Sequence, residues 1–246
     1  MSTVSGVTKH KMSTSERLSG PQIWLQGDPE DLRDMMPLGI AGLVTNNLIL
    51  RDMAQKYTNL NSLLARYLEL DPNALVVEVD GDTYEEFLYA AEVASDLSDK
   101  VIVKVVTKPV GIRVLATLRS RGIRTMATTV FSLNQAIMMA AAGADWIAPF
   151  VGPTHGGGND AFALVQQISE TFKGRPRMPG IMGGIIRDPS HAQIAYAAGA
   201  DAIVTFPNVY WDMLKHAGTD EWNTTFRHAW ADMEDRGQLD GYIPAD

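Results

Sequence analysis

Two charged side chains stand inside apolar segments, where an unpaired charge is costly to bury. Lys104 lies within residues 101–106, Val-Ile-Val-Lys-Val-Val, and Glu78 lies within 74–79, Ala-Leu-Val-Val-Glu-Val. Side chains alternate between the two faces of a strand, so Ile102, Lys104 and Val106 share one face. If that face points inward, its amine is held out of water and becomes a better nucleophile, as Schiff-base chemistry requires. The strand alone leaves open an outward lysine with its head group in water.

A buried Glu78 needs a partner, and Lys104 on the next apolar segment would be one. The alternative is a structural ion pair without a catalytic role. Thr128 lies on the segment that follows, 125–130. A hydroxyl and a carboxylate on either side of an amine can hold a water for proton transfer. Threonine is common in strands, so Thr128 alone decides nothing.

Further polar residues follow other apolar segments. Thr45 and Asn46 end the second, and an amide there can hold a substrate hydroxyl, although asparagine also caps helices well. Arg187 precedes an expected helix start, which favours binding of an anion; the alternative is a salt bridge with Asp188. Residues 155–158, His-Gly-Gly-Gly, lack a phosphate-loop spacing and indicate a mobile loop. No histidine spacing indicates a metal site, and we expect no cofactor.

These residues depend on a regular alternation of short apolar runs and amphipathic segments. The expected strands are 23–25, 41–44, 74–79, 101–106, 125–130, 146–151, 180–186 and 202–206. The expected helices are 29–36, 47–70, 83–97, 109–119, 132–142, 159–172, 188–198, 208–216 and 222–233. Short strands buried on both faces indicate a parallel sheet. The pattern predicts an α/β fold, a (β/α)8 TIM barrel of one domain, with a doubly wound sheet as the alternative.

Composition narrows the class of protein. The 246 residues include no cysteine and carry a net charge of 21 − 29 = −8. An acidic chain without a basic block is a poor nucleic-acid binder, and no apolar run is long enough for a membrane span. We expect a cytoplasmic protein. Residues 1–21 are predicted to be a disordered leader or tag remnant, 22–220 the barrel, and 221–246 a C-terminal helix and tail.

Taken in order, several motifs resemble one family. They are 23–25 (Ile-Trp-Leu), 42–46 (Gly-Leu-Val-Thr-Asn), 77–79, 101–105, 128–136, 141–144, 148–152 (Ala-Pro-Phe-Val-Gly), 187–189 (Arg-Asp-Pro) and 198–201. The chain resembles the small transaldolases and fructose-6-phosphate aldolase-like proteins, which are class I Schiff-base aldolases on a (β/α)8 barrel. No single motif is decisive, but the ordered set is specific.

The resemblance implies a role for each matching position. Lys104 matches the Schiff-base lysine on the fourth strand. Glu78 and Thr128 match the pair that holds a proton-shuttling water. Three further positions match substrate-binding residues or the loop after the fifth strand: Asn46, Ser132 and Asn134.

The chain also departs from the family pattern. The catalytic aspartate of the first strand is Gln26, which hydrogen-bonds but takes no proton at neutral pH; Asp28, two residues on, is a candidate substitute. A phosphate-clamping arginine is replaced by Pro153, and a serine of the anion loop by Ile185. Of that anion-binding set only Arg187 remains. The usual sugar phosphate is therefore a doubtful substrate.

The first hypothesis is a divergent transaldolase-like Schiff-base enzyme that transfers or cleaves a ketone unit of a sugar or hydroxyketone. Gln26, Thr45 and Asn46 would bind hydroxyls. The alternatives are a Schiff-base enzyme of different outcome (isomerisation, dehydration or condensation) and a non-catalytic descendant. The resemblance implies a homo-oligomer, a pentamer or decamer. Aromatic residues spaced along 222–230 favour burial, within the chain or against a partner.

Overall fold

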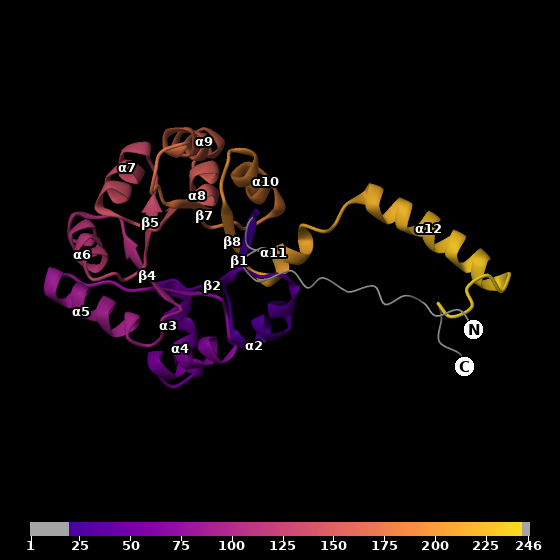
Figure 1. Cartoon of the computed structure of the whole chain (residues 1–246), viewed down its shortest axis with the longest axis horizontal. Coiled ribbons are helices and arrows are strands. Elements are labelled where there is room, and N and C mark those ends of the chain that lie inside the picture. The colour runs from indigo at the N-terminus through magenta and orange to yellow at the C-terminus, as the bar shows by residue number, and fades with distance from the viewer. Residues whose placement is uncertain (1–19, 243–246) are drawn as a thin grey trace.

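The computed structural model of the chain describes residues 20–242 and contains a closed barrel of eight parallel strands in chain order (Figure 1). The predicted α/β class and single-domain (β/α)8 TIM barrel are thereby confirmed. The strands are β1 Gln22–Leu25, β2 Gly42–Val44, β3 Leu75–Glu78, β4 Val101–Val106, β5 Thr125–Val130, β6 Trp146–Pro149, β7 Gly180–Gly183 and β8 Ala202–Thr205. Closure between β1 and β8 leaves no free sheet edge within this barrel.

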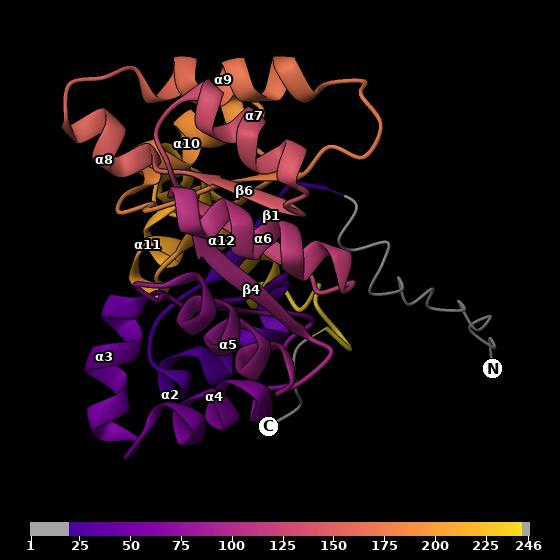
Figure 2. The same cartoon turned by 90° about the vertical axis from the view of Figure 1, so that its left-hand side faces the viewer.

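Helices surround the ring of strands (Figures 1 and 2). They are α2 Pro29–Leu32, η1 Arg33–Leu38 (a 3-10 helix), α3 Asn47–Lys56, α4 Leu60–Glu69, α5 Tyr84–Ser95, α6 Pro109–Ser120, α7 Leu133–Ala142, α8 Val151–Gly156, α9 Ala161–Phe172, α10 Pro189–Ala197, α11 Pro207–Asp212 and α12 Ala217–Asp235. A capping box formed by Thr83 and Glu86 starts α5, and Gly143 ends α7 in the left-handed conformation, as helix termini commonly do.

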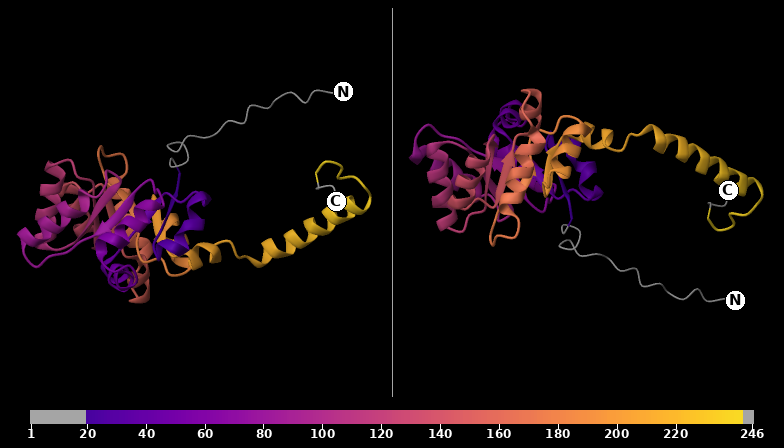
Figure 3. Two further views of the ribbon diagram at one scale, coloured as in Figure 1. Left: turned by 90° about the horizontal axis from the view of Figure 1, so that it is seen from below. Right: turned by 90° about the horizontal axis from the view of Figure 1, so that it is seen from above.

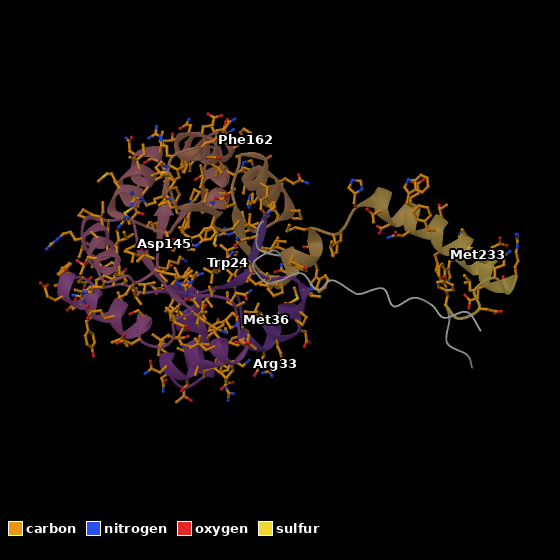
Figure 4. All side chains as sticks on the ribbon, in the orientation of Figure 1. Trp24, Arg33, Met36, Asp145, Phe162 and Met233 are labelled. Atoms are coloured by element: carbon orange, nitrogen blue, oxygen red, sulfur yellow. The ribbon has the colours of Figure 1, made fainter. Side chains whose placement is uncertain are left out.

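Apolar side chains fill both sides of the barrel wall. One buried cluster lies between the strands and the helices. A second cluster fills the interior and includes Trp24, Val76, Met126 and Met182; Figure 4 labels Trp24 within the ring of strands. Because side chains alternate along a strand, the next inward position after each of these lies one layer higher, towards the carboxyl ends. That layer carries the polar residues of the site.

Several segments differ from the sequence-based expectation. The strand expected over 180–186 ends at Gly183, and the helix expected over 208–216 ends at Asp212. The helix expected over 47–70 is two helices, because Thr58 adopts a positive φ of 74° and Asn59 caps α4. The helix expected over 29–36 becomes a 3-10 turn after Leu32. The loop expected at 155–158 is partly the short helix α8, which begins at Val151, where a strand was expected to continue.

The C-terminal helix α12 stands away from the barrel (Figure 3), and none of its residues is buried. Within residues 20–242, no helix has the length and apolar character needed to cross a membrane. The predicted leader, residues 1–21, lies outside the described residues except for its last two.

Candidate active site

Lys104 points into the barrel. Its side chain is buried, and the Nζ atom lies 2.8 Å from Oε2 of Glu78 and donates to the Thr45 carbonyl oxygen at 3.0 Å. The ion pair follows from strand register, since Glu78 on β3 is the partner of Lys104 on β4. The structure therefore places the amine on the inward face, and the outward alternative does not occur.

A cavity of about 210 Å³, here called the inner cavity, opens at this ion pair. Its hydrogen-bonding side chains are Gln26, Asn46, Asn47, Glu78, Lys104, Thr128 and Thr129. Its remaining lining is Val44, Leu48, Met126, Ala148, Phe150, Met182, Gly184, Ile185 and Val204. The carboxyl ends of the barrel strands thus meet at one small, largely apolar space around a buried amine, which is where (β/α)8 enzymes place their chemistry.

Thr45 holds both members of the ion pair in place. Its carbonyl oxygen accepts from Lys104, while its hydroxyl donates to the Val76 carbonyl and accepts from the Glu78 backbone N–H. The hydroxyl is buried and fully engaged, and Thr45 does not line the inner cavity. In this structure Thr45 therefore lies behind the site, where it links β2 to β3.

An irregularity in β5 shapes the other side of the amine. The β5–β6 register shifts between Ala127 and Val130, and Thr129 has a φ of 58°. A β-branched residue in that conformation is strained by about 1–3 kcal/mol, and such strain collects at functional sites. The Thr128 hydroxyl is buried and has no hydrogen-bond partner among the described residues. Thr128 also lines the inner cavity, as Lys104 does.

Gln26 and Asn46 form the wall on β1 and β2. The side-chain Oδ1 of Asn46 accepts from the Leu48 and Ile49 backbone N–H groups and caps α3, while its Nδ2 donates to Oε1 of Gln26 at 3.1 Å. Asn46 is thus both a helix cap and part of the cavity wall. Gln26 is buried and lines both cavities described here.

A second, larger cavity of about 1000 Å³, the outer cavity, adjoins the first and shares Gln26, Asn46, Leu48 and Ile185 with it. Its lining includes five carboxylates: Asp28, Glu30, Asp31, Asp34 and Asp52. Arg187 is the one cation among its lining residues within the described chain, and its guanidinium forms no ion pair there. The salt bridge considered for Arg187 and Asp188 does not form; Asp188 caps α10.

Asp28, the candidate substitute for the first-strand aspartate, is already engaged in hydrogen bonds. Its carboxylate accepts from the Lys56 ammonium at 2.7 Å, the Tyr57 hydroxyl at 2.6 Å and the Glu30 backbone. Burial alone would raise the pKa of Asp28, but these hydrogen bonds outweigh it and hold the pKa below its usual value, because they favour the charged form. Asp28 lines the outer cavity but not the inner one, so Glu78 is the carboxylate nearest the amine.

Two of the predicted site residues lie elsewhere. Ser132 caps α7 and lines a different surface hollow, and Asn134 lines neither cavity. No group of three His, Cys, Asp or Glu side chains within the described chain is arranged to hold a metal ion. Sequence reasoning missed Thr129 as a lining residue, since its positive φ is not visible in a motif.

The arrangement supports one kind of chemistry. A buried primary amine faces a small, largely apolar space, a carboxylate lies within hydrogen-bond distance of it, and an unsatisfied hydroxyl lies on the next strand. An amine so placed can attack a carbonyl carbon, and the carboxylate and hydroxyl can carry protons through a water.

Comparisons with a family profile and with individual proteins point to the same family. A family profile described as Transaldolase/Fructose-6-phosphate aldolase matches residues 26–240. A probable transaldolase of Carboxydothermus hydrogenoformans is 33% identical over 206 residues, covering 83% of this chain and 95% of the relative. A probable transaldolase of Thermoplasma acidophilum is 29% identical over 211 residues, 85% of this chain and 95% of the relative.

Among solved structures, the chain is similar to thiamine phosphate pyrophosphorylase from Pyrococcus furiosus. The TM-score is 0.50 at 20% identity, covering 77% of this chain and 87% of that one. At that identity the likeness concerns the fold alone.

Proposed function

The chain belongs to the transaldolase/fructose-6-phosphate aldolase family, and from that premise we propose that it is a Schiff-base aldolase or transaldolase. Lys104 is its nucleophile, and the substrate is a sugar or hydroxyketone. The observation that supports this most is the buried Lys104 amine, paired with Glu78 and open to the inner cavity. A lysine kept there for stability alone would not need an adjoining space lined by hydrogen-bonding groups.

The proposed reaction begins when the Lys104 amine, having passed a proton to Glu78, attacks the substrate carbonyl carbon. The carbonyl oxygen takes up protons and leaves as water, which gives an iminium ion. The iminium draws the electron pair of the bond between its α and β carbons as that bond breaks and the hydroxyl on the β carbon gives up its proton, so that an aldehyde leaves and an enamine stays on Lys104. Addition of the enamine to another aldehyde transfers the ketone unit; protonation and hydrolysis release it.

Glu78 and Thr128 serve the proton steps in this proposal. Glu78 takes the amine proton and returns it to the departing oxygen through a water that the unsatisfied Thr128 hydroxyl helps to hold. Gln26 and Asn46 orient a substrate hydroxyl next to the bond that breaks. Gln26 takes no proton from that hydroxyl, so the cleavage step relies on water linked to Glu78.

We further propose that the phosphate site of the family is altered here. Carboxylates outnumber cations along the outer cavity, where Lys56 and Arg51 each offset part of the acidic charge from outside its lining. Each charge-assisted contact that is missing removes about 1.5–3 kcal/mol of affinity for a phosphate. The substrate is accordingly unphosphorylated or differently charged, and Arg187 is the group left for an acidic end; Ser132 and Asn134 lie outside both cavities.

Product analysis tests the proposal. The protein is incubated with a panel of phosphorylated and unphosphorylated ketoses with an acceptor aldehyde, and cleaved or transferred products are identified. Lys104→Met should abolish turnover, whereas Lys108→Met should leave it unchanged, because Lys108 pairs with Asp80 outside the inner cavity. Products that keep all the substrate carbons would favour isomerisation or dehydration, which the absence of an acid at Gln26 would explain. Turnover that survives Lys104→Met would refute the proposal.

A homo-oligomer is the second part of the proposal. Trp222, Phe226, Trp230 and Met233 form one stripe along α12; Trp222 and Phe226 are about 60% exposed, and Met233 marks the far end of the helix in Figure 4. An exposed aromatic stripe of this kind marks an interaction surface, and a second copy of the chain is its proposed partner, in a pentamer or decamer. Light scattering of Trp222→Ser/Phe226→Ser should report smaller particles than the wild type; equal size would contradict the proposed role of this stripe in assembly.

The cytoplasm is the proposed compartment, to be checked by cell fractionation.

A further inference from the structure

The segment between β7 and α10, residues 184–188, here called the arginine loop, brings Ile185 and Arg187 to the wall of the outer cavity. Ile185 has a φ of 56°, a conformation that is unfavourable for a β-branched side chain. A backbone in this state persists only where its surroundings hold it. The place of Arg187, two residues further on, therefore depends on the contacts that hold the arginine loop.

Backbone contacts hold the first residues of the arginine loop. The N–H and the carbonyl of Gly184 both bond to the backbone at the end of β6 and the start of α8. Gly152 of α8 lies so close that a Cβ added there would overlap the Ile185 carbonyl oxygen. These contacts fix the start of the loop against α8, and none of them reaches Arg187.

Side chains hold the rest of the loop. Among the described residues, two side chains bond to the backbone of 185–187. The Thr205 hydroxyl donates to the Ile186 carbonyl at 3.1 Å, and the Arg187 N–H donates to Nδ1 of His191 at 3.3 Å. His191 is 8% exposed and lies on α10, which packs against α8 (Figure 1). His191 is thus the buried side chain that holds the backbone at Arg187 itself.

The hydrogen bond from Arg187 also fixes the state of the His191 ring. Nδ1 accepts only when it carries no proton, so the proton of the neutral ring is on Nε2. Nε2 lies 3.4 Å from the Asp188 carboxylate. The His155 ring packs edge-on against the His191 ring, with 5.6 Å between the centroids. Asp188 and His155 therefore limit rotation of the ring and keep Nδ1 directed at the Arg187 N–H.

We propose that His191 is a positioning residue: it holds the Arg187 backbone so that the guanidinium lines the outer cavity and meets an acidic group of the substrate. This inference rests on the proposed function, which gives Arg187 that role. His191 lines neither the inner nor the outer cavity, so it acts through Arg187. The alternative is a histidine that only fills space, which an apolar side chain of the same size would do without burying ring nitrogens.

Amide hydrogen exchange tests the contact without any substrate. His191→Asn keeps an acceptor, because Oδ1 of asparagine can take the place of Nδ1, whereas His191→Leu keeps a similar volume and has no acceptor. Exchange of the Arg187 amide is resolved by mass spectrometry of fragmented peptides from the full-length protein. It should be about two- to tenfold faster in His191→Leu, which is the net effect of one hydrogen bond, and close to the wild-type rate in His191→Asn. Equal exchange in His191→Leu and the wild type would contradict the contact.

Substrate preference tests the positioning role. Glyceraldehyde and glyceraldehyde 3-phosphate differ by one anionic group, and kcat/KM is measured for each as the acceptor. Arg187→Gln should lower the ratio of the anionic to the neutral acceptor by about tenfold or more, since it removes a charge-assisted contact. His191→Leu should lower the ratio several-fold, through KM rather than kcat, and His191→Asn should restore most of it. In the Arg187→Gln background, His191→Leu should change the ratio no further.

The remaining outcomes separate the positioning role from the proposed function. A further fall of the ratio when His191→Leu is added to Arg187→Gln overturns the positioning role, as does an equal fall in kcat with both acceptors. An unchanged ratio in His191→Leu, with turnover intact, also removes the positioning role and leaves the proposed function standing. Absence of turnover with any acceptor in the folded wild type removes the proposed function and the substrate role of Arg187 together, whereas the amide exchange still shows whether His191 holds the loop.

Discussion

Breaking the buried ion pair between Lys104 and Glu78 should destabilise the protein, and breaking it from both sides should restore most of the loss. The atoms lie 2.8 Å apart, and the side chains are only 8% and 12% exposed. Removal of one partner from such a pair leaves an uncompensated charge and costs about 3–5 kcal/mol. Because the pair borders a cavity that admits water, we expect Glu78→Gln and Lys104→Met each to cost about 2–3 kcal/mol.

The double variant distinguishes this account from simple loss of packing. Methionine approaches the length of the lysine stem, and glutamine keeps the shape of glutamate, so Lys104→Met/Glu78→Gln should lie within about 1 kcal/mol of the wild type. The coupling energy is read from urea unfolding with the slope held constant across variants. Asp80→Asn is the control, because its pair with Lys108 is exposed and should be worth about 1 kcal/mol or less. Losses that add within about 0.5 kcal/mol would refute the reasoning.

Three further predictions concern single residues. Gln26→Asp places an acid beside the bond that breaks and should raise the rate of aldol cleavage by about 100-fold in a product-release assay; an unchanged rate would mean that this step is not limited by the missing acid. Asp28→Asn should lower the melting temperature at pH 7. Since the folded-state pKa of Asp28 lies below its ordinary value of 3.8, the difference should shrink as the pH falls from about 4 through that lowered pKa; a difference independent of pH would contradict it. Thr58→Gly relieves a positive φ of 74° at an exposed position. It should raise the melting temperature by about 2–4 °C in a thermal scan, with no rise arguing against strain there.

The alternation of apolar runs was sufficient to predict the barrel. Strands 101–106 and 125–130 agree with β4 and β5 residue for residue, because valine- and threonine-rich runs bounded by turn residues have few other stable conformations. Residues 141–147 and 197–203 have nearly the same sequence, Ala-Ala-Gly-Ala-Asp followed by Trp-Ile or Ala-Ile. The two segments also have the same structural role. Asp145 and Asp201 each accept from the backbone of a neighbouring strand, and so join two adjacent strands at their starts.

The site was only partly predictable. The periodicity of β4 grouped Lys104 with Ile102 and left the direction of that face open, since both faces of a barrel strand are apolar. The closed barrel decided it, because Lys104 and its register partner Glu78 both line the inner cavity. The break at Thr58 was hidden because leucines keep helical spacing on both sides of it. The wall of the inner cavity at Phe150 and Ile185 depends on the directions of these two side chains, which follow the ends of β6 and β7. The direction of a side chain in a loop follows from packing rather than from a motif.

The central claim is that Lys104 forms an imine with a ketone. Borohydride reduction in the presence of hydroxyacetone, followed by peptide mapping, tests it most directly. The account predicts a single reduced adduct on the peptide that carries Lys104, absent in Lys104→Met and retained in Lys108→Met. An adduct on a different lysine, or none in a folded protein across the panel of ketones, would contradict it.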